Sequence, residues 1–163
     1  MPEAADSGLD LNVRFDVSSR QNGSSMAKLN VGFILARHFT LSAFANFVDV
    51  LRLAADEGDR SRPIHCGWRV LSPTMHPVVS SCGVVVQPEE RLGDPGRFDY
   101  LVVVGGLVDG IEILHPDTVH FLRRAAMVRV PLVGVCTGTF ALHSAGLMRG
   151  YRACVSWFHH ADF

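Results

Sequence analysis

A cysteine flanked by two glycines is the arrangement in this 163-residue sequence with the clearest chemical meaning. The apolar run from Val130 to Val135 leads directly to Cys136, and Gly134 and Gly138 stand two residues to either side of it. We predict a strand that turns sharply into a helix at Cys136, which is the local shape of a nucleophile elbow. The amide groups at the start of such a helix would stabilise a thiolate. A buried structural cysteine in an ordinary strand is the competing interpretation.

The composition indicates one globular domain with no preference for polyanions. A chain of 163 residues fits a single α/β domain, and 48% hydrophobic and 19% charged residues with a formal net charge of -1 lack the basic surplus of a nucleic-acid binder. The cysteines show no C-x-x-C spacing, so we predict no metal, no cofactor and no disulfide framework, and we expect a reducing cytoplasm. No apolar run approaches the roughly 20 residues of a membrane span, and no signal peptide is recognisable.

The elements that position this cysteine begin after a polar lead-in. We expect residues 1–27 to be a flexible lead-in, with Met26 an alternative start, and residues 28–163 to form the domain. A strand is predicted over 29–35 and a helix over 41–56, with Thr40 as its N-cap. This helix is apolar nearly all round, which predicts burial on two sides. The second side is either a subunit interface or is covered by loops of the same chain.

Further strand and helix signals alternate along the rest of the chain. Strands are predicted over 68–72 and 99–104, a hairpin over 78–87, helices over 115–128 and from Cys136 to about Leu147, and a last strand over 151–156. The pattern favours a mainly parallel sheet with helices on both faces. Ligands bind such sheets beyond the carboxyl ends of the strands. The residues expected at those ends, in one crevice, are Gly105, Gly106, Cys136, Ser156 and Trp157.

Three segments together resemble a known superfamily. The strand and glycine pair of 102–106, the turn of 134–138 and the segment 146–157 are similar to the ThiJ/PfpI, or class I glutamine amidotransferase-like, superfamily. The resemblance is greatest to the N-terminal domains of amidotransferase-like AraC/XylS-type transcriptional regulators. It implies a flavodoxin-like three-layer sandwich, a homodimer, and a helix-turn-helix region that would follow in the regulators. Under this interpretation the domain is incomplete at its C-terminus, and DNA is contacted only through that absent region.

The residues that would make the cysteine catalytic depart from the superfamily pattern. Catalytic members carry a histidine where Ser156 aligns, and serine cannot act as a base near neutral pH. They also carry a glutamate early in the first helix, where Ala43 aligns, and Asp49 lies almost two turns later. His159 and His160 either substitute for the histidine or form a solvated pair. Whether the chain is an enzyme therefore stays open, with the non-catalytic interpretation favoured.

We predict a non-catalytic, small-molecule-sensing and dimerisation domain of a transcriptional regulator. The helix start at Cys136 and the glycine pair would bind a small polar or anionic effector. The alternatives are a stand-alone cysteine enzyme of amidase, hydrolase or glyoxalase type, redox sensing through Cys136, and a degenerate gene product. The predicted ligand-binding residues are Gly105, Gly106, Cys136, Thr137, Ser156 and Trp157, with His38 as a further candidate.

Overall fold

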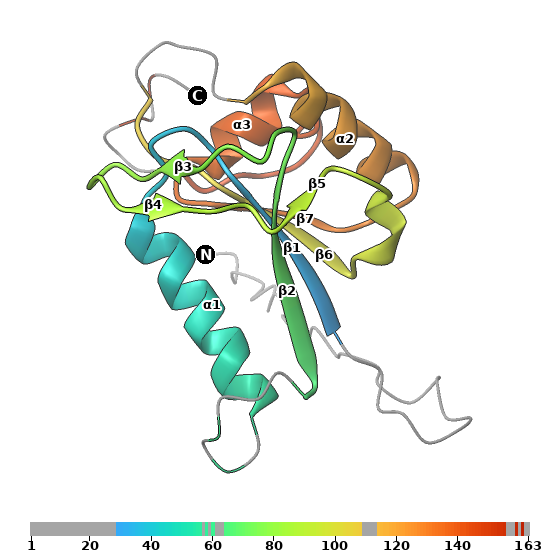
Figure 1. Ribbon diagram of the computed structural model, residues 1–163. Coiled ribbons are helices and arrows are strands. Elements are labelled where there is room, and N and C mark those ends of the chain that lie inside the picture. The colour runs from blue at the N-terminus through green and yellow to red at the C-terminus, as the bar shows by residue number, and fades with distance from the viewer. Residues whose placement is uncertain are drawn as a thin grey trace, which may run out of the picture.

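The structure, a computed structural model, describes residues 29–56, 58, 60, 64–108, 114–155, 159 and 161. Its centre is a five-stranded sheet in the order β5-β2-β1-β6-β7 (Figure 1). All neighbouring strands in this sheet are parallel. The strands are β1 (Leu29–Leu35), β2 (Cys66–Ser72), β5 (Glu90–Arg91), β6 (Tyr100–Val104) and β7 (Leu132–Val135).

Helices cover both faces of this sheet, so the fold is the predicted three-layer α/β sandwich. One cluster of apolar side chains joins β1 and β6 to α1, and the other joins the opposite face to α2 and α3. Continuous apolar runs such as that of β6 are expected where a strand is buried on both faces. The helices are α1 (Leu41–Ala55), α2 (Pro116–Met127), α3 (Gly138–Ser144) and the short 3-10 turn η1 (Pro95–Arg97).

Side chains of alternate residues in the central strands pack against the helices on opposite faces of the sheet. The Phe33 ring of β1 meets Phe44 and Phe47 of α1 edge-to-face, with ring centroids 5.3 and 5.5 Å apart. Ile34, the next residue along β1, belongs to the opposite cluster with Phe121 of α2. Full burial of such a side chain contributes about 1.5–3 kcal/mol, so these contacts hold the helices against the sheet.

A small hairpin lies beside the carboxyl end of β1. Its strands β3 (Val78–Val79) and β4 (Val85–Val86) pair antiparallel, as the sequence predicted. The hairpin is hydrogen-bonded to the segment that follows β1, because His38 N donates to Val79 O at 3.1 Å and Ser81 N donates to Phe39 O at 2.9 Å. The hairpin therefore fixes the loop between β1 and α1.

Two predictions near the C-terminus need correction. The helix after Cys136 ends at Ser144, before Leu147, because Gly146 adopts a left-handed backbone with φ 77° and donates from its N–H to His143 O. The last strand, predicted over 151–156, is wrong for residues 151–155, which are not in a strand. A strand is stable only when it pairs, and Tyr151 N instead donates to Met148 O in a turn. Ser156 lies outside the described residues.

The outer face of α1 is more open than the sequence suggested. Ala55 is its one buried residue, whereas Val50 and Leu53 are 64% and 59% exposed. In the described residues, the prediction that loops of the same chain bury this side is therefore wrong, and the subunit-interface interpretation stays a prediction. None of the helices that the structure describes is long and apolar enough to cross a bilayer.

Candidate functional site

Three loops meet at the carboxyl edge of the sheet, one after each of β1, β6 and β7. Thr40 N donates to Gly105 O at 2.9 Å, and Phe39 and Gly106 form an isolated antiparallel bridge. Gly105 N in turn donates to Val135 O at 3.1 Å, next to Cys136. The loops after these strands thus come together from segments almost a hundred residues apart, and the predicted crevice between them stays a prediction.

The glycine pair allows these loops to approach closely. A Cβ on Gly105 would overlap the backbone of Thr137 and Gly138, and a Cβ on Gly106 would overlap the carbonyl group of His38. Backbone cannot move away as a flexible side chain can. Packing of the chain on itself therefore requires glycine at both positions, whether or not a ligand also approaches them.

Cys136 lies on the turn between β7 and α3 with a left-handed backbone, φ 56°. Non-glycine residues rarely adopt this conformation, and it is found at functional sites when the surrounding structure imposes it. The turn joins β7 directly to α3, as the sequence predicted. The residue is exposed, so the competing interpretation of a buried structural cysteine is wrong. Thr137, the next residue, donates from its hydroxyl to Gly106 O at 2.6 Å and so ties this turn to the loop after β6.

Thr40 is the site residue that the sequence missed. It is the N-cap of α1, as predicted, but its side chain makes no capping hydrogen bond. Its Oγ1 lies 3.4 Å from the Cys136 Sγ instead, within hydrogen-bond distance for sulfur. The signal was indirect, since only the strand order β1-β6-β7 brings the ends of β1 and β7 to the same edge.

The acid and base candidates make contacts with other residues or lie outside the described residues. Ala43 packs into the apolar cluster under α1, and Asp49 forms an ion pair with Arg52 at 3.7 Å. The imidazole of His159 packs against Phe140, with ring centroids 5.9 Å apart. Ser156, Trp157 and His160 lie outside the described residues, so their predicted places stay predictions.

The thiol of Cys82 has a lowered pKa. The Ser80 hydroxyl, 3.3 Å from the Cys82 Sγ, holds the pKa of Cys82 below its usual value, and a hydrogen bond with the Val84 backbone acts in the same direction. Cys82 is exposed at the tip of the β3–β4 hairpin. Of the residues that the structure describes, no three His, Cys, Asp or Glu side chains are arranged to hold a metal ion.

Comparisons with known proteins agree on one family. The model of the DJ-1/PfpI family matches residues 31–163. The HTH-type transcriptional regulator GbdR of Pseudomonas aeruginosa is 33% identical over 129 residues, which are 78% of this chain and 34% of the regulator. This chain thus spans about a third of the length of that relative.

An enzyme and a solved regulator are similar to the same region. Isonitrile hydratase of Pseudomonas putida is 30% identical over 132 residues, covering 81% of this chain and 54% of the enzyme. The crystal structure of an AraC family transcriptional regulator from Pseudomonas putida matches with a TM-score of 0.66 and 26% identity, covering 82% of this chain and 70% of that chain. Both kinds of relative are therefore similar to most of this chain.

Proposed function

This chain belongs to the DJ-1/PfpI family, and we propose that within it the chain is the effector-sensing and dimerisation domain of a transcriptional regulator. The observation that carries the proposal is its similarity to transcriptional regulators, GbdR in sequence and the AraC family protein in structure. DNA contact would then belong to a part of the regulator outside these residues. A cytoplasmic homodimer that responds to a small molecule is the form we propose.

The proposed effector site is the convergence of loops around Cys136. Its polar groups are the exposed Cys136 thiol and the Thr40 hydroxyl, and the loop of Gly105 and Gly106 forms a wall that Thr137 holds in place. Ser156 and Trp157, outside the described residues, complete the proposed set. Such a group of donors and acceptors at the carboxyl edge of a parallel sheet is the usual place for a ligand in this type of fold.

The thiol contributes shape and polarity in this proposal, without acting as a nucleophile. An activated cysteine needs an adjacent base, and among the described residues the Cys136 thiol has the hydroxyl of Thr40 within hydrogen-bond distance. A neutral hydroxyl does not take a proton from a thiol near pH 7. We therefore expect the replacement of Cys136 by serine to change the affinity for the effector, and we expect no catalytic rate that depends on this thiol.

The outer face of α1 is the proposed dimer surface. Val50 and Leu53 expose apolar side chains there, 64% and 59% accessible. Exposed apolar patches on a folded domain mark surfaces that associate. Sedimentation of this chain at micromolar concentration tests the point. A dimer that Val50→Glu turns into a monomer supports it, and a monomer at every concentration contradicts it.

The regulator proposal as a whole is tested on the native gene product. We expect its intact mass, measured from its own cells, to exceed that of this chain by on the order of 10 kDa or more, one DNA-binding domain. We further expect the native protein to retain duplex DNA from its own upstream region. An intact mass equal to this chain, with no DNA retained, would overturn the proposal.

A second candidate, a stand-alone cysteine enzyme, is favoured by the similarity to isonitrile hydratase. It requires Cys136 to add to a substrate without the usual histidine. Incubation of the chain with an alkyl isonitrile tests it directly. Mass spectrometry would detect the N-alkylformamide that forms when water adds to the isonitrile. Product that disappears with Cys136→Ser would establish the enzyme, and no product above the rate of the Cys136→Ser variant would dismiss this activity.

A further inference from the structure

A cavity separate from the Cys136 turn opens at the carboxyl ends of β1 and β2. Its volume is about 560 Å³, and it lies among the loop after β1, the segment of residues 72–79 and the start of α2. Pockets for small molecules have volumes of about 300–1,000 Å³, so this one has room for a small organic ligand. A single inorganic ion would leave most of it empty.

The polar lining of this cavity carries cation-forming groups. Arg37, His38, His76 and His115 contribute to it from three different segments. The described lining residues include no Asp or Glu. In the described part of the chain, no carboxylate lies within ion-pair distance of the Arg37 guanidinium. The exposed Arg37 guanidinium is therefore available to a negatively charged group, whereas the lining residue His115 already has the Asp117 carboxylate 3.6 Å from its Nδ1.

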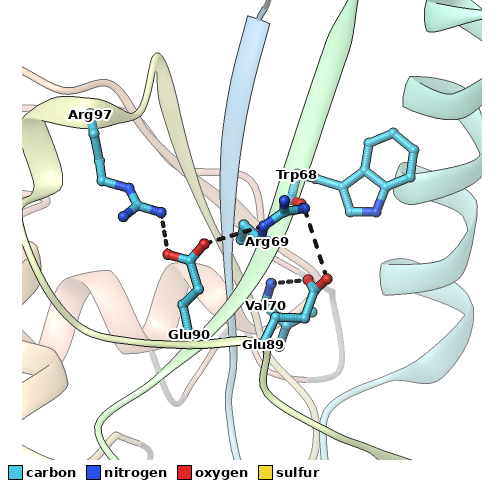
Figure 2. Close-up of polar contacts among 6 residues, drawn as sticks. All are labelled: Trp68, Arg69, Val70, Glu89, Glu90 and Arg97. Atoms are coloured by element: carbon cyan, nitrogen blue, oxygen red, sulfur yellow. Dashed lines mark hydrogen bonds and ion pairs between the residues drawn. The ribbon is translucent and has the colours of Figure 1, made fainter. Parts of the chain in front are cut away.

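Two arginines near β2 and η1, Arg69 and Arg97, are paired with carboxylates. Figure 2 shows Glu90 between Arg69 and Arg97, with Glu89 on the other side of Arg69. Arg69 Nε lies 3.2 Å from Glu90 Oε1, and Arg97 pairs with the second oxygen of the same carboxylate. Arg37 has no such carboxylate partner within the described residues, whereas Arg69 and Arg97 do.

Buried hydroxyls and one oriented imidazole add hydrogen-bonding groups to the lining. Ser72 and Thr118 both line the cavity and are 8% and 2% exposed. The Nδ1 of His115 accepts the N–H of Asp117 at 3.2 Å, which leaves the proton of a neutral imidazole on Nε2. The carboxylate of Asp117 lies 3.6 Å from that Nδ1.

Apolar side chains form the remaining wall. They come from the ends of β1 and β2, from β3 and from a residue two positions before α2, so a hydrocarbon part of a ligand would be removed from water there. A ligand complementary to the whole cavity combines a charged head with a short apolar body. These side chains are Ile34, Leu35, Leu71, Val78 and Leu114.

We propose that this cavity binds a small organic anion, with a carboxylate or phosphate head held by Arg37 and the histidines and a short hydrocarbon body against the apolar wall. Planar guanidinium groups pair with the oxygens of either head. The site is distinct from the Cys136 turn and goes beyond the function proposed above, because it does not require the thiol.

Titration of the full chain with four probes at one pH tests this proposal. Hexanoate and hexyl phosphate carry both features, acetate lacks the hydrocarbon body and 1-hexanol lacks the charge. Two-dimensional amide NMR would report binding at the described loops. We expect saturable binding of hexanoate or hexyl phosphate, with the tighter of the two identifying the head group, and at least about tenfold weaker binding of acetate and 1-hexanol. No saturable binding of either amphipathic anion would overturn the proposal.

Matched variants locate the binding. We expect Arg37→Gln to weaken hexanoate or hexyl phosphate by about tenfold or more, because one charge-assisted contact is lost. Arg124→Gln, an exposed arginine on α2 outside the lining, is the control and should leave binding unchanged. Equal affinity in Arg37→Gln and Arg124→Gln would overturn the assignment, with circular dichroism confirming that both fold.

Cys136→Ser separates this site from the proposed effector site. Anion binding that survives Cys136→Ser and is lost in Arg37→Gln supports the cavity, whatever the outcome for a regulator. Anion binding that is lost in Cys136→Ser and kept in Arg37→Gln places the anion at the turn and contradicts the cavity. The regulator proposal itself depends on the mass and DNA retention of the native product, so the two can fail independently.

Discussion

The polar groups at the carboxyl edge of the sheet and those in the charged cluster around Arg69 differ in whether they have partners within the chain. In the cluster, each arginine meets a carboxylate, and Glu89 also accepts the Val70 N–H at 2.9 Å (Figure 2). At the carboxyl edge, Cys136 is exposed on a strained turn and Arg37 has no carboxylate partner within the described residues. The difference indicates that polar groups in the cluster serve the fold, whereas those at the edge are available to a ligand.

The largest effect is expected where the edge depends on close backbone packing. Gly105→Ala would force a Cβ into the backbone of Thr137 and Gly138, which cannot give way locally. We expect the free energy of unfolding to fall by about 3 kcal/mol, at the upper end of overpacking effects. Urea denaturation measures it. Gly93→Ala, whose nearest atom would be the Arg91 carbonyl oxygen at 4.0 Å, is the control, and an equal loss in both variants would contradict this account.

Relief of strain at Cys136 should have a smaller effect of opposite sign. Glycine tolerates φ 56°, whereas L-residues lose about 1–2 kcal/mol in the left-handed region. We expect Cys136→Gly to raise the free energy of unfolding by about 1 kcal/mol and Cys136→Val to lower it. Denaturation of the pair measures both. A Cys136→Gly variant less stable than the parent would show that contacts of the thiol outweigh the strain.

The charged cluster should tolerate the loss of its central acid. Glu90 pairs with Arg69 and Arg97, but the side chains are 30%, 53% and 48% exposed, so solvent screens their interaction. We expect Glu90→Gln to cost no more than about 1 kcal/mol of unfolding free energy, and less at high salt. A loss above the effect of Gly105→Ala would reverse the order proposed here for the two regions.

Thiol reactivity should sharpen the comparison within the carboxyl edge. The lowered pKa of Cys82 gives it more thiolate at neutral pH, so we expect iodoacetamide to label Cys82 faster than an ordinary exposed thiol below pH 8. Ser80→Ala should raise the pKa of Cys82 and slow its labelling several-fold, because the hydroxyl stabilises the thiolate. Peptide mass spectrometry reads both rates. Faster labelling of Cys136 would support redox sensing at the turn instead.

The central strands of the sheet were predictable from local signals, whereas the two-residue edge strand β5 (Glu90–Arg91) was not predicted. The strand over 29–35 was predicted without error, and the helix that follows it to within one residue, because a run of apolar residues with clear breaks determines each. The last strand was wrong for 151–155 because apolar and β-branched residues form a strand only beside a partner. Local patterns therefore predict elements best where the sheet supplies neighbours on both sides.

The candidate site was predictable only in part. Cys136 and the glycine pair stand out as sequence motifs, and the structure brings their loops together. The contact between Thr40 and Cys136 follows from strand order, which no local pattern contains. The cavity beside β2 is more distant still from sequence signals, since its lining comes from three separate segments. Sites made by tertiary assembly are visible only after the topology is known.

The strand order also determines when the Cys136 turn can form. Thr40 and Cys136 are 96 residues apart in the chain, and the sheet between them consists of parallel pairings, each of which closes a long loop. Non-local contacts of this kind form slowly, because chain entropy is lost before they stabilise anything. A nascent chain that has emerged only to β6 can already pair β1 with β2, yet it lacks Cys136 and the turn around it. The turn can therefore form only after the strands that precede it in the chain have been made.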